Sequence, residues 1–256
     1  MLWIKGGRVR SWLSCAAGGL ACSLILVAQV ATPPAQPQTT PNPTPNQQSV
    51  PSTTAAPMRL QFIMIDPAHG GSESGAILNP AVLEKDVNLA FARRLRQELS
   101  SRGIQAQLLR DGDVLLTTDQ RASMVNSARP ALYIGIHAAS QGRGMGIYTA
   151  MLSDDPGAGD RGPFLNWRTA QSATLPRSRA TQQQLAEAIQ KTGFPVRAVG
   201  APLRPLSNIV VPALAIEIAP TTGDTSQLAS PDYQQMVSAV LANAIATIRT
   251  RLGNAP

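Results

Sequence analysis

The stretch IDPAHGGSESGAILNPAVLEKDVNLA runs from Ile65 to Ala90. It begins in a hydrophobic, β-branched run that a proline and a glycine pair bring to an end, which predicts a buried strand over Arg59–Asp66. Its last part begins the segment Glu84–Arg102, where apolar residues recur every four positions and Gly103 follows, a pattern typical of an amphipathic helix. The stretch therefore joins a strand to a helix through a glycine-rich loop that carries His69.

The rest of the chain continues this alternation of strands and helices. Further strands are predicted over residues 104–109, 131–137, 146–151 and 212–218, and further helices over 118–128, 182–191 and 230–252. The strands are apolar on both faces, as in a sheet that helices cover from both sides. We therefore expect an α/β domain with a single mixed, mostly parallel sheet and helices on both faces.

The first 57 residues have a different composition. Residues 1–10 carry three basic side chains and no acidic one, and residues 12–31 are almost wholly apolar, which is typical of a secretory signal and long enough to span a bilayer. Residues 32–57 are rich in proline and have no charge, which predicts an extended linker. We expect an exported domain at 58–256, in the periplasm or cell envelope. Residues 1–31 are either a cleaved signal or an anchor to the inner membrane, and they provide the only membrane contact.

Charge and cysteine content narrow the class of partner and site. The formal net charge is +7 and aromatic residues make up 4% of the chain, but no basic stripe alternates with aromatics, so we do not expect a nucleic-acid partner. A mild positive charge equally suits an anionic cell wall. Both cysteines, Cys15 and Cys22, lie in the apolar N-terminal run, so a metal in the exported part must be held by His, Asp or Glu.

Both histidines of the chain lie where predicted strands end. His69 comes three residues after the first strand, and His137 closes the strand 131–137. Glu84 begins the first helix, and Glu217 lies near the end of the last strand. Because ligands gather at the carboxyl ends of strands in α/β sheets, we expect these four side chains to converge at one edge.

This set of side chains suits hydrolytic chemistry. Two histidines and a carboxylate leave one open position on a tetrahedral Zn2+, where a water of lowered pKa can bind. We expect His69, Glu84 and His137 to be the zinc ligands and Glu217 to be the catalytic acid/base that passes a proton to the leaving amine. Simpler roles also stay open: a hydrogen-bonded histidine at a strand end, or Glu84 as an acid that stabilises the start of a helix.

Two neighbouring motifs have simpler interpretations. Asp66, next to a proline, is either a turn former or a residue that supports the metal site. The run G-x-G-x-G at Gly142–Gly146 is not followed directly by a helix, so we expect it to admit the chain to the next strand rather than to bind a dinucleotide.

Taken in order, five strings resemble the zinc-dependent N-acetylmuramoyl-L-alanine amidases of the type-3 family. They are IDPAHGG, LEKDVNLAFARRLRQEL, LLRDGD, YIGIHA and PALAIEI, and the resemblance covers about residues 62–252. It implies zinc at His69, Glu84 and His137, with Glu217 as the catalytic acid/base. It also implies peptidoglycan as substrate, cut at the amide between N-acetylmuramic acid and L-alanine during wall remodelling or daughter-cell separation.

The sequence also departs from the family's pattern near the site. Ala68 stands where the family has glycine before the histidine, and Ser72–Gly75 differs from the usual Asp-Pro-Gly, which affects how a substrate would be positioned. Relatives can carry a regulatory helix near residues 154–181 that a division-associated activator protein displaces. The resemblance therefore implies that Phe164–Gln171 covers or borders the site. A non-catalytic wall-binding or regulatory domain and a zinc peptidase acting on stem peptides stay open as alternatives.

Overall fold

The computed structural model describes residues 62–152 and 167–253 of the chain. Residues 1–31 and 32–57, expected to be a signal or anchor and a linker, lie outside the described residues, so both assignments stay predictions. In the part of the chain that the structure describes, no helix is both long and apolar enough to cross a membrane.

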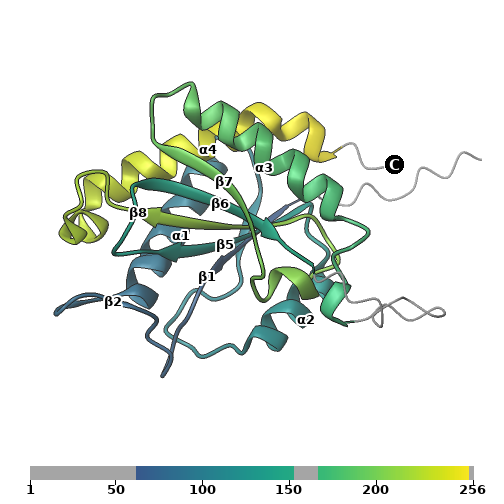
Figure 1. Cartoon of the computed structure of the whole chain (residues 1–256), viewed down its shortest axis with the longest axis horizontal. Coiled ribbons are helices and arrows are strands. Elements are labelled where there is room, and N and C mark those ends of the chain that lie inside the picture. The colour runs from purple at the N-terminus through teal and green to yellow at the C-terminus, as the bar shows by residue number, and fades with distance from the viewer. Residues whose placement is uncertain (1–61, 153–166, 254–256) are drawn as a thin grey trace, which may run out of the picture. The chain divides into compact units, whose positions relative to one another are not determined.

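The centre of the domain is a six-stranded sheet (Figure 1). Its strands are β1 (Ile63–Pro67), β4 (Ala106–Leu108), β5 (Leu132–Ala138), β6 (Gly144–Ala150), β7 (Val196–Ala201) and β8 (Ala213–Ala219). Their spatial order is β4-β1-β5-β8-β6-β7. Neighbouring strands are parallel except for the pair β6 and β8. The sheet is therefore mixed and mostly parallel, as predicted.

Helices cover both faces of the sheet, but unequally. The long helices are α1 (Glu84–Ser101), α3 (Leu175–Gln190) and α4 (Pro231–Gly253), and the short helix is α2 (Thr118–Ala128). The three long helices pack on one face, where Leu95, Leu185 and Ile245 join the larger hydrophobic core. On the opposite face, Ala122 and Val125 of α2 join a smaller core with Leu206 of the 3-10 turn η3 (Leu206–Asn208). Figure 1 shows α3 and α4 above the sheet and α2 below it.

Local sequence signals explain where two of these helices begin. Thr117 precedes α2 and forms a capping box, in which its side chain accepts from the Gln120 amide and the Gln120 side chain accepts from the Thr117 amide. Pro231 is the first residue of α4, a position where a proline costs no helical hydrogen bond. Glu84 begins α1, as predicted.

The prediction for α3 was wrong at its start, because the helix begins at Leu175 rather than at residue 182. Pro176 lies in the first turn, where it is tolerated. Ser178 and Thr181 are buried polar residues, so the first two turns lack the apolar periodicity that the prediction relied on. The edge strand β7 and the hairpin of β2 (Ile77–Asn79) and β3 (Val82–Leu83) were not predicted.

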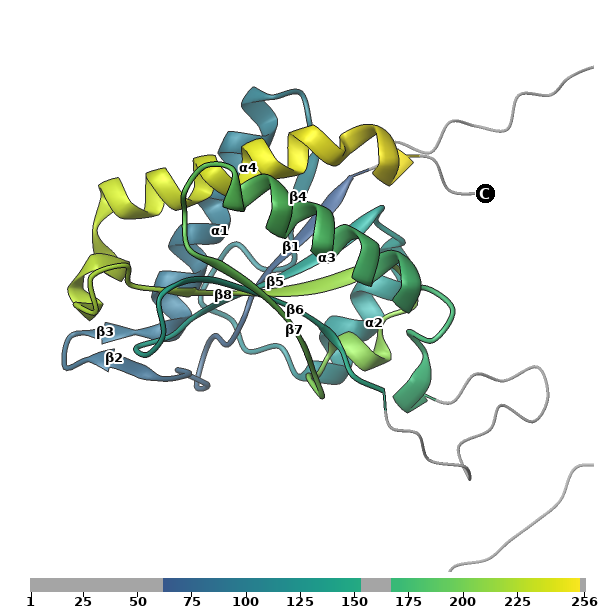
Figure 2. The ribbon, with the colours of Figure 1, turned by 45° about the horizontal axis from the view of Figure 1, so that its top comes forward.

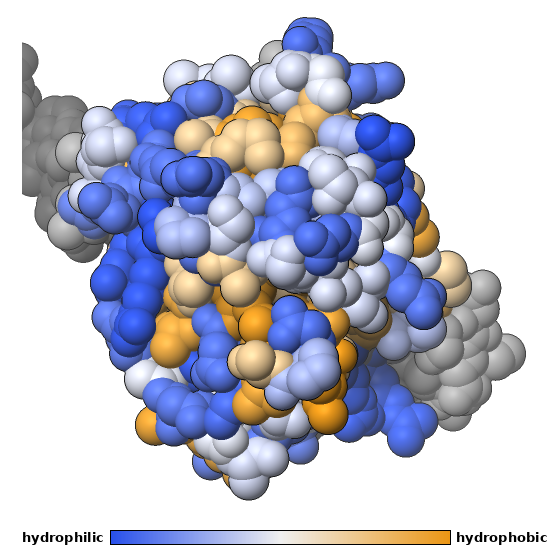
Figure 3. Space-filling model, turned by 90° about the vertical axis from the view of Figure 1, so that its left-hand side faces the viewer, coloured by the Kyte–Doolittle hydropathy of each residue, from blue (hydrophilic) through white to orange (hydrophobic). Residues whose placement is uncertain are grey.

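The hairpin of β2 and β3 projects beside the start of α1 (Figure 2). Seen from the side on which β2 lies, the surface mixes hydrophilic residues with several hydrophobic clusters rather than showing one chemical character (Figure 3). Ile77, which is 69% exposed, is the most exposed large hydrophobic residue among those that the structure describes. This side of the domain is therefore chemically mixed.

Candidate metal centre

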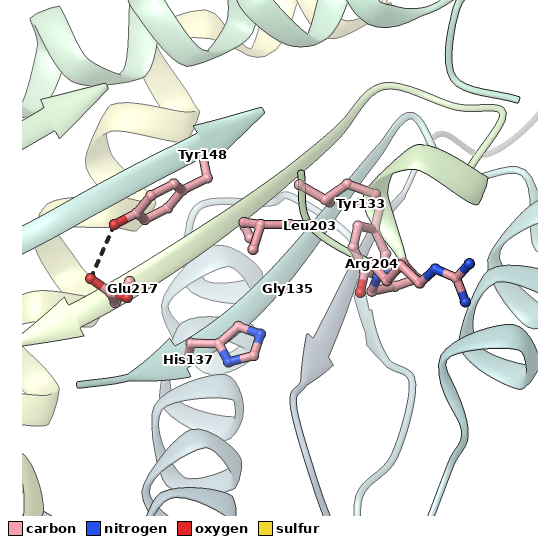
Figure 4. A pocket seen from close by; sticks show the side chains of 10 residues that line it. Tyr133, Gly135, His137, Tyr148, Leu203, Arg204 and Glu217 are labelled. Atoms are coloured by element: carbon pink, nitrogen blue, oxygen red, sulfur yellow. Dashed lines mark hydrogen bonds between the residues drawn. The ribbon is translucent and has the colours of Figure 1, made fainter. Parts of the chain in front are cut away.

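The alternation of side chains along β5 and β8 places two of the predicted site residues on the less covered face of the sheet. Leu214 and Ile216 belong to the core beneath α1, α3 and α4, so Glu217 between Ile216 and Ile218 projects the other way. The register pairs His137 of β5 with Glu217 of β8. Because paired residues of neighbouring strands are about 4.8 Å apart, the two side chains lie next to each other. Figure 4 shows both projecting on the same side of the sheet.

The loop after β1 holds His69 in a left-handed backbone conformation, with φ at 62°, where a non-glycine residue is uncommon. Two buried arginines hold the carbonyl groups of this loop. Arg110 donates from Nε to Pro67 O at 2.8 Å and from Nη2 to Ala68 O at 3.1 Å, and Arg121 donates from Nη2 to His69 O at 2.8 Å. The loop is thus fixed by side chains that come from other parts of the chain.

Asp66, on β1, supports the His69 loop through its contact with Arg121. It is buried, pairs with Arg121 Nη1 and accepts a hydrogen bond from the Tyr133 hydroxyl at 2.6 Å. Burial and the charge of Asp66 raise the pKa of Tyr133 well above its ordinary value, so the phenol stays a donor. Asp66 therefore acts on the His69 loop through Arg121 and is not a turn former alone.

Glu84 meets both histidines at the carboxyl edge of the sheet. Its Oε1 lies 3.2 Å from His69 Nε2 and 3.0 Å from His137 Nδ1. Ligand atoms of the three residues all lie within 4.8 Å of one another. Oε2 of Glu84 accepts a hydrogen bond from the Ala76 amide at 2.9 Å, and Asn88 Nδ2 lies 3.3 Å from Oε1. The three residues predicted as ligands are therefore brought together.

The electrostatics of this cluster favour an ionised carboxylate. Burial alone would raise the pKa of Glu84, but hydrogen bonds with His137 and His69 outweigh it and hold the pKa far below its usual range. The hydrogen bond with Glu84 raises the pKa of His69 against the opposing effect of burial, and Glu73 adds to the rise. Glu73 Oε1 lies 3.2 Å from His69 Nδ1, but that nitrogen forms no hydrogen bond of good geometry. The Glu73 contact is therefore a close approach of the two groups rather than a directed hydrogen bond.

The cluster fits a divalent metal ion by its donor set and by the space around it. Zinc in hydrolytic sites takes three protein ligands from nitrogen and oxygen donors and keeps one position open. Gly75 closes one side of the cluster, where a Cβ would lie 2.6 Å from both Glu84 Oε2 and His69 Cδ2. A backbone without a side chain is thus required where the loop passes the histidine and the carboxylate. The two imidazoles and Glu84 form a candidate metal site.

Glu217 has polar surroundings on its own face of the sheet, although the residues on either side of it in sequence are apolar. The apolar residues beside it in sequence belong to the opposite face of the sheet. On its own face, Glu217 Oε1 accepts from Arg197 Nη2 at 2.6 Å and from the Tyr148 hydroxyl at 3.1 Å. The hydrogen bond to Tyr148 and the charge of Glu217 raise the pKa of Arg197.

A cavity of about 200 Å³ lies beside these groups (Figure 4). His137 and Glu217 line it at the metal-site end, and Leu203 and Leu206 line it further along the sheet. Among the described residues of the segment expected to cover the site, Trp167–Gln171 do not line this cavity. The backbone amide of Gln171 instead donates to Ser207 O at 3.2 Å, which places that segment against the turn η3. Residues 164–166 lie outside the described residues.

Several residues of the site were missed from the sequence. Asn88 lies four positions after Glu84 on α1, so helical spacing alone puts both on one face and could have found it. Arg110 and Arg121 carry no local signal, because their partners are backbone carbonyls distant in sequence. Arg197 lies on the strand that was not predicted.

Two imidazoles and a buried carboxylate thus meet at the carboxyl edge of the sheet, and a further carboxylate lies on the adjoining strand. These features define the class as an α/β domain with a candidate metal centre, whose donor set is of the kind found in hydrolytic zinc sites. The chain belongs to the N-acetylmuramoyl-L-alanine amidase family, whose model matches residues 63–247. Among individual proteins, the chain is similar to the N-acetylmuramoyl-L-alanine amidase LytC of Bacillus subtilis, with 39% identity over 82 residues. That segment is 32% of this chain and 16% of LytC, so the chain spans a small part of the length of that relative.

Solved structures show the same fold. The amidase Ami1 from Mycobacterium smegmatis superposes with a TM-score of 0.56, with 20% identity over 75% of this chain and 97% of that chain. The CwlD amidase from Clostridioides difficile, solved in complex with the GerS lipoprotein, gives a TM-score of 0.51 with 22% identity over 75% of this chain and 99% of that chain. At these identities the likeness establishes the α/β fold.

Proposed function

We propose that the domain hydrolyses the amide bond between N-acetylmuramic acid and L-alanine in peptidoglycan. The observation that carries this proposal is the meeting of His69, Glu84 and His137 with Glu217 in the next position across the sheet. Family membership identifies the bond, because the matching family is that of the N-acetylmuramoyl-L-alanine amidases.

His69, Glu84 and His137 would hold the metal ion, for which we propose zinc. When bound there, the ion supplies Lewis-acid polarisation of the amide carbonyl and makes a water molecule a stronger nucleophile. Asn88 and the Ala76 amide keep the Glu84 carboxylate in place by their hydrogen bonds.

Glu217 would move the proton. Its Oε1 accepts from Arg197 and Tyr148, and its Oε2 has no partner among residues 62–152 and 167–253. Oε2 takes a proton from the attacking water as the water oxygen bonds to the carbonyl carbon. The same carboxyl group then gives that proton to the amide nitrogen, the carbon–nitrogen bond breaks, and the stem peptide leaves as an amine.

The substrate sets the expected location and partners. Peptidoglycan lies outside the cytoplasmic membrane, so an exported domain in the periplasm or cell envelope agrees with the apolar segment 12–31. The chemically mixed surface on the side of β2 suits a polymer of polar sugars and short peptides (Figure 3). A protein activator is a further proposed partner, for which CwlD bound to GerS offers a parallel in a related fold.

The decisive experiment is digestion of purified sacculi followed by mass spectrometry of the soluble products. The wild-type protein should release intact stem peptides that begin at L-alanine, and a chelator should stop the release. Glu217→Gln should lower the rate by roughly 10²- to 10⁴-fold with metal content unchanged, because it removes the proton carrier alone. Glu187→Gln, an exposed carboxylate on α3, is the matched control and should keep the wild-type rate.

Each other outcome identifies a different function. Peptides cut within the stem would indicate a peptidase, and binding of sacculi without any release would indicate a wall-binding domain. Near-normal turnover by Glu217→Gln would remove the acid/base role from that carboxylate.

A further inference from the structure

A single row of residues crosses the sheet beside the candidate metal centre. The register pairs Arg197 of β7 with Gly146 of β6, Gly146 with Glu217 of β8, and Glu217 with His137 of β5. Residues paired across a sheet project on the same side, so this row lies on the face that α2 covers. Gly146 is the member of the row that has no side chain.

Gly146 leaves the space across which Arg197 reaches Glu217. Arg197 Nη2 lies 2.6 Å from Glu217 Oε1 and 2.6 Å from the Tyr148 hydroxyl, although a whole strand separates β7 from β8. A Cβ on Gly146 would lie 2.7 Å from Tyr148 Cε2 and 3.2 Å from Arg197 Nη2. The arrangement of these side chains therefore requires a glycine at this position.

Folding stability does not account for this contact. The Arg197 side chain is 42% exposed and that of Glu217 is 32% exposed, and ion pairs as open as this one contribute little to stability. The contact nevertheless has short, charge-assisted geometry, and two donors converge on one carboxylate oxygen. A carboxylate fixed through Oε1 has a defined direction for Oε2.

We propose that Arg197, supported by Tyr148, is a positioning residue that holds Glu217 so that Oε2 faces the reacting water and the leaving nitrogen. This inference rests on the proposed amidase function and assigns a role to two residues that the metal site does not include. A misplacement of a catalytic group by about 1 Å can cost on the order of 100-fold in rate. Loss of Arg197 should therefore slow the chemical step rather than weaken substrate binding.

Steady-state kinetics on a soluble N-acetylmuramoyl-L-alanyl peptide test the role of Arg197. Arg197→Gln should lower kcat by about 10- to 100-fold with KM within about 3-fold of the wild type. Arg197→Lys should restore part of kcat, because a cation still reaches the carboxylate. Arg179→Gln, an exposed arginine on α3, changes the net charge equally and should keep the wild-type kcat. In a Glu217→Gln background, Arg197→Gln should cause no further loss, since the group that it positions is already gone.

A second measurement does not depend on activity. The carboxylate 13C signal of Glu217 should shift in Arg197→Gln and in Tyr148→Phe, and should not shift in Arg179→Gln. A wild-type protein that releases no stem peptide would overturn the proposed function, while the carbon signal would still report whether the contact exists. Three results would overturn the positioning role: a wild-type kcat in Arg197→Gln, a raised KM at unchanged kcat, or a full further loss in the Glu217→Gln background.

Discussion

Replacing Arg121 by methionine should destabilise the domain more than any exposed charge change. Arg121 and Asp66 form a buried ion pair whose side chains are 5% and 2% exposed. The substitution leaves the Asp66 carboxylate buried without its cation and removes the donors to Leu116 O and His69 O. Breaking a buried ion pair by removing one partner costs about 3–5 kcal/mol. For a domain of this size, roughly 2–4 °C per kcal/mol gives a fall in Tm of about 6–20 °C.

Urea unfolding and thermal melts of the purified domain would measure this loss. Arg96→Met is the control, because Arg96 forms an exposed pair with Asp111 and its loss should cost less than about 1 kcal/mol. Adding Asp66→Leu to Arg121→Met should recover part of the stability, since apolar pairs can replace buried ion pairs. A loss below about 1 kcal/mol for Arg121→Met would refute the reasoning, because it would mean that the loop carrying His69 does not depend on this pair.

Two further predictions concern the candidate metal centre. Gly75→Ala should lower zinc affinity, measured by competition with a chromogenic chelator, by about 10- to 100-fold, as for groups that support metal ligands. Gly193 has a similar positive φ but no atom within 4 Å of an added Cβ, so Gly193→Ala should leave zinc affinity unchanged. If both variants lose zinc affinity equally, steric crowding by the Cβ at residue 75 is not the cause. Without metal, the raised pKa of His69 stabilises the fold below about pH 6.5, and this contribution is lost as pH rises through the folded-state pKa. The lowered pKa of Glu84 stabilises the fold above about pH 4.5. The urea midpoint of the metal-free protein should thus be higher at pH 6 than at pH 8. Saturating zinc should reverse this order, because protons compete with the metal for the histidine nitrogens. If the midpoint with zinc is still higher at pH 6, these residues are not the zinc ligands.

Local patterns were sufficient for the parts of the site that lie at element ends. Glu84 is the first residue of an amphipathic helix, and His137 and Glu217 lie near the ends of strongly apolar strands, so their positions follow from periodicity. The same patterns predicted the mixed α/β sheet, because buried strands alternate with helices along the chain.

The rest of the site depends on contacts that sequence patterns do not report. The residues on either side of Glu217 in sequence are apolar, but alternation along β8 places their side chains on the opposite face of the sheet. Arg197 lies on β7, an edge strand whose residues are half-buried or exposed, so it lacks the hydrophobic pattern of a strand. Its position beside Glu217 follows from the register of three strands, which only the folded sheet defines.

The antiparallel placement of β6 explains why these residues meet the metal centre. In a wholly parallel sheet, only the carboxyl ends of strands reach the edge where His137 and Glu217 lie. Since β6 runs against β8, and β7 runs with β6, the beginnings of both strands reach that same edge. Gly146 and Arg197 lie near those beginnings. Gly146 leaves space beside Glu217, and the Arg197 side chain occupies that space. The antiparallel pairing of β6 with β8 thus brings the Arg197 guanidinium, and the space at Gly146, to a site that in a wholly parallel sheet would contain only residues from the carboxyl ends of strands.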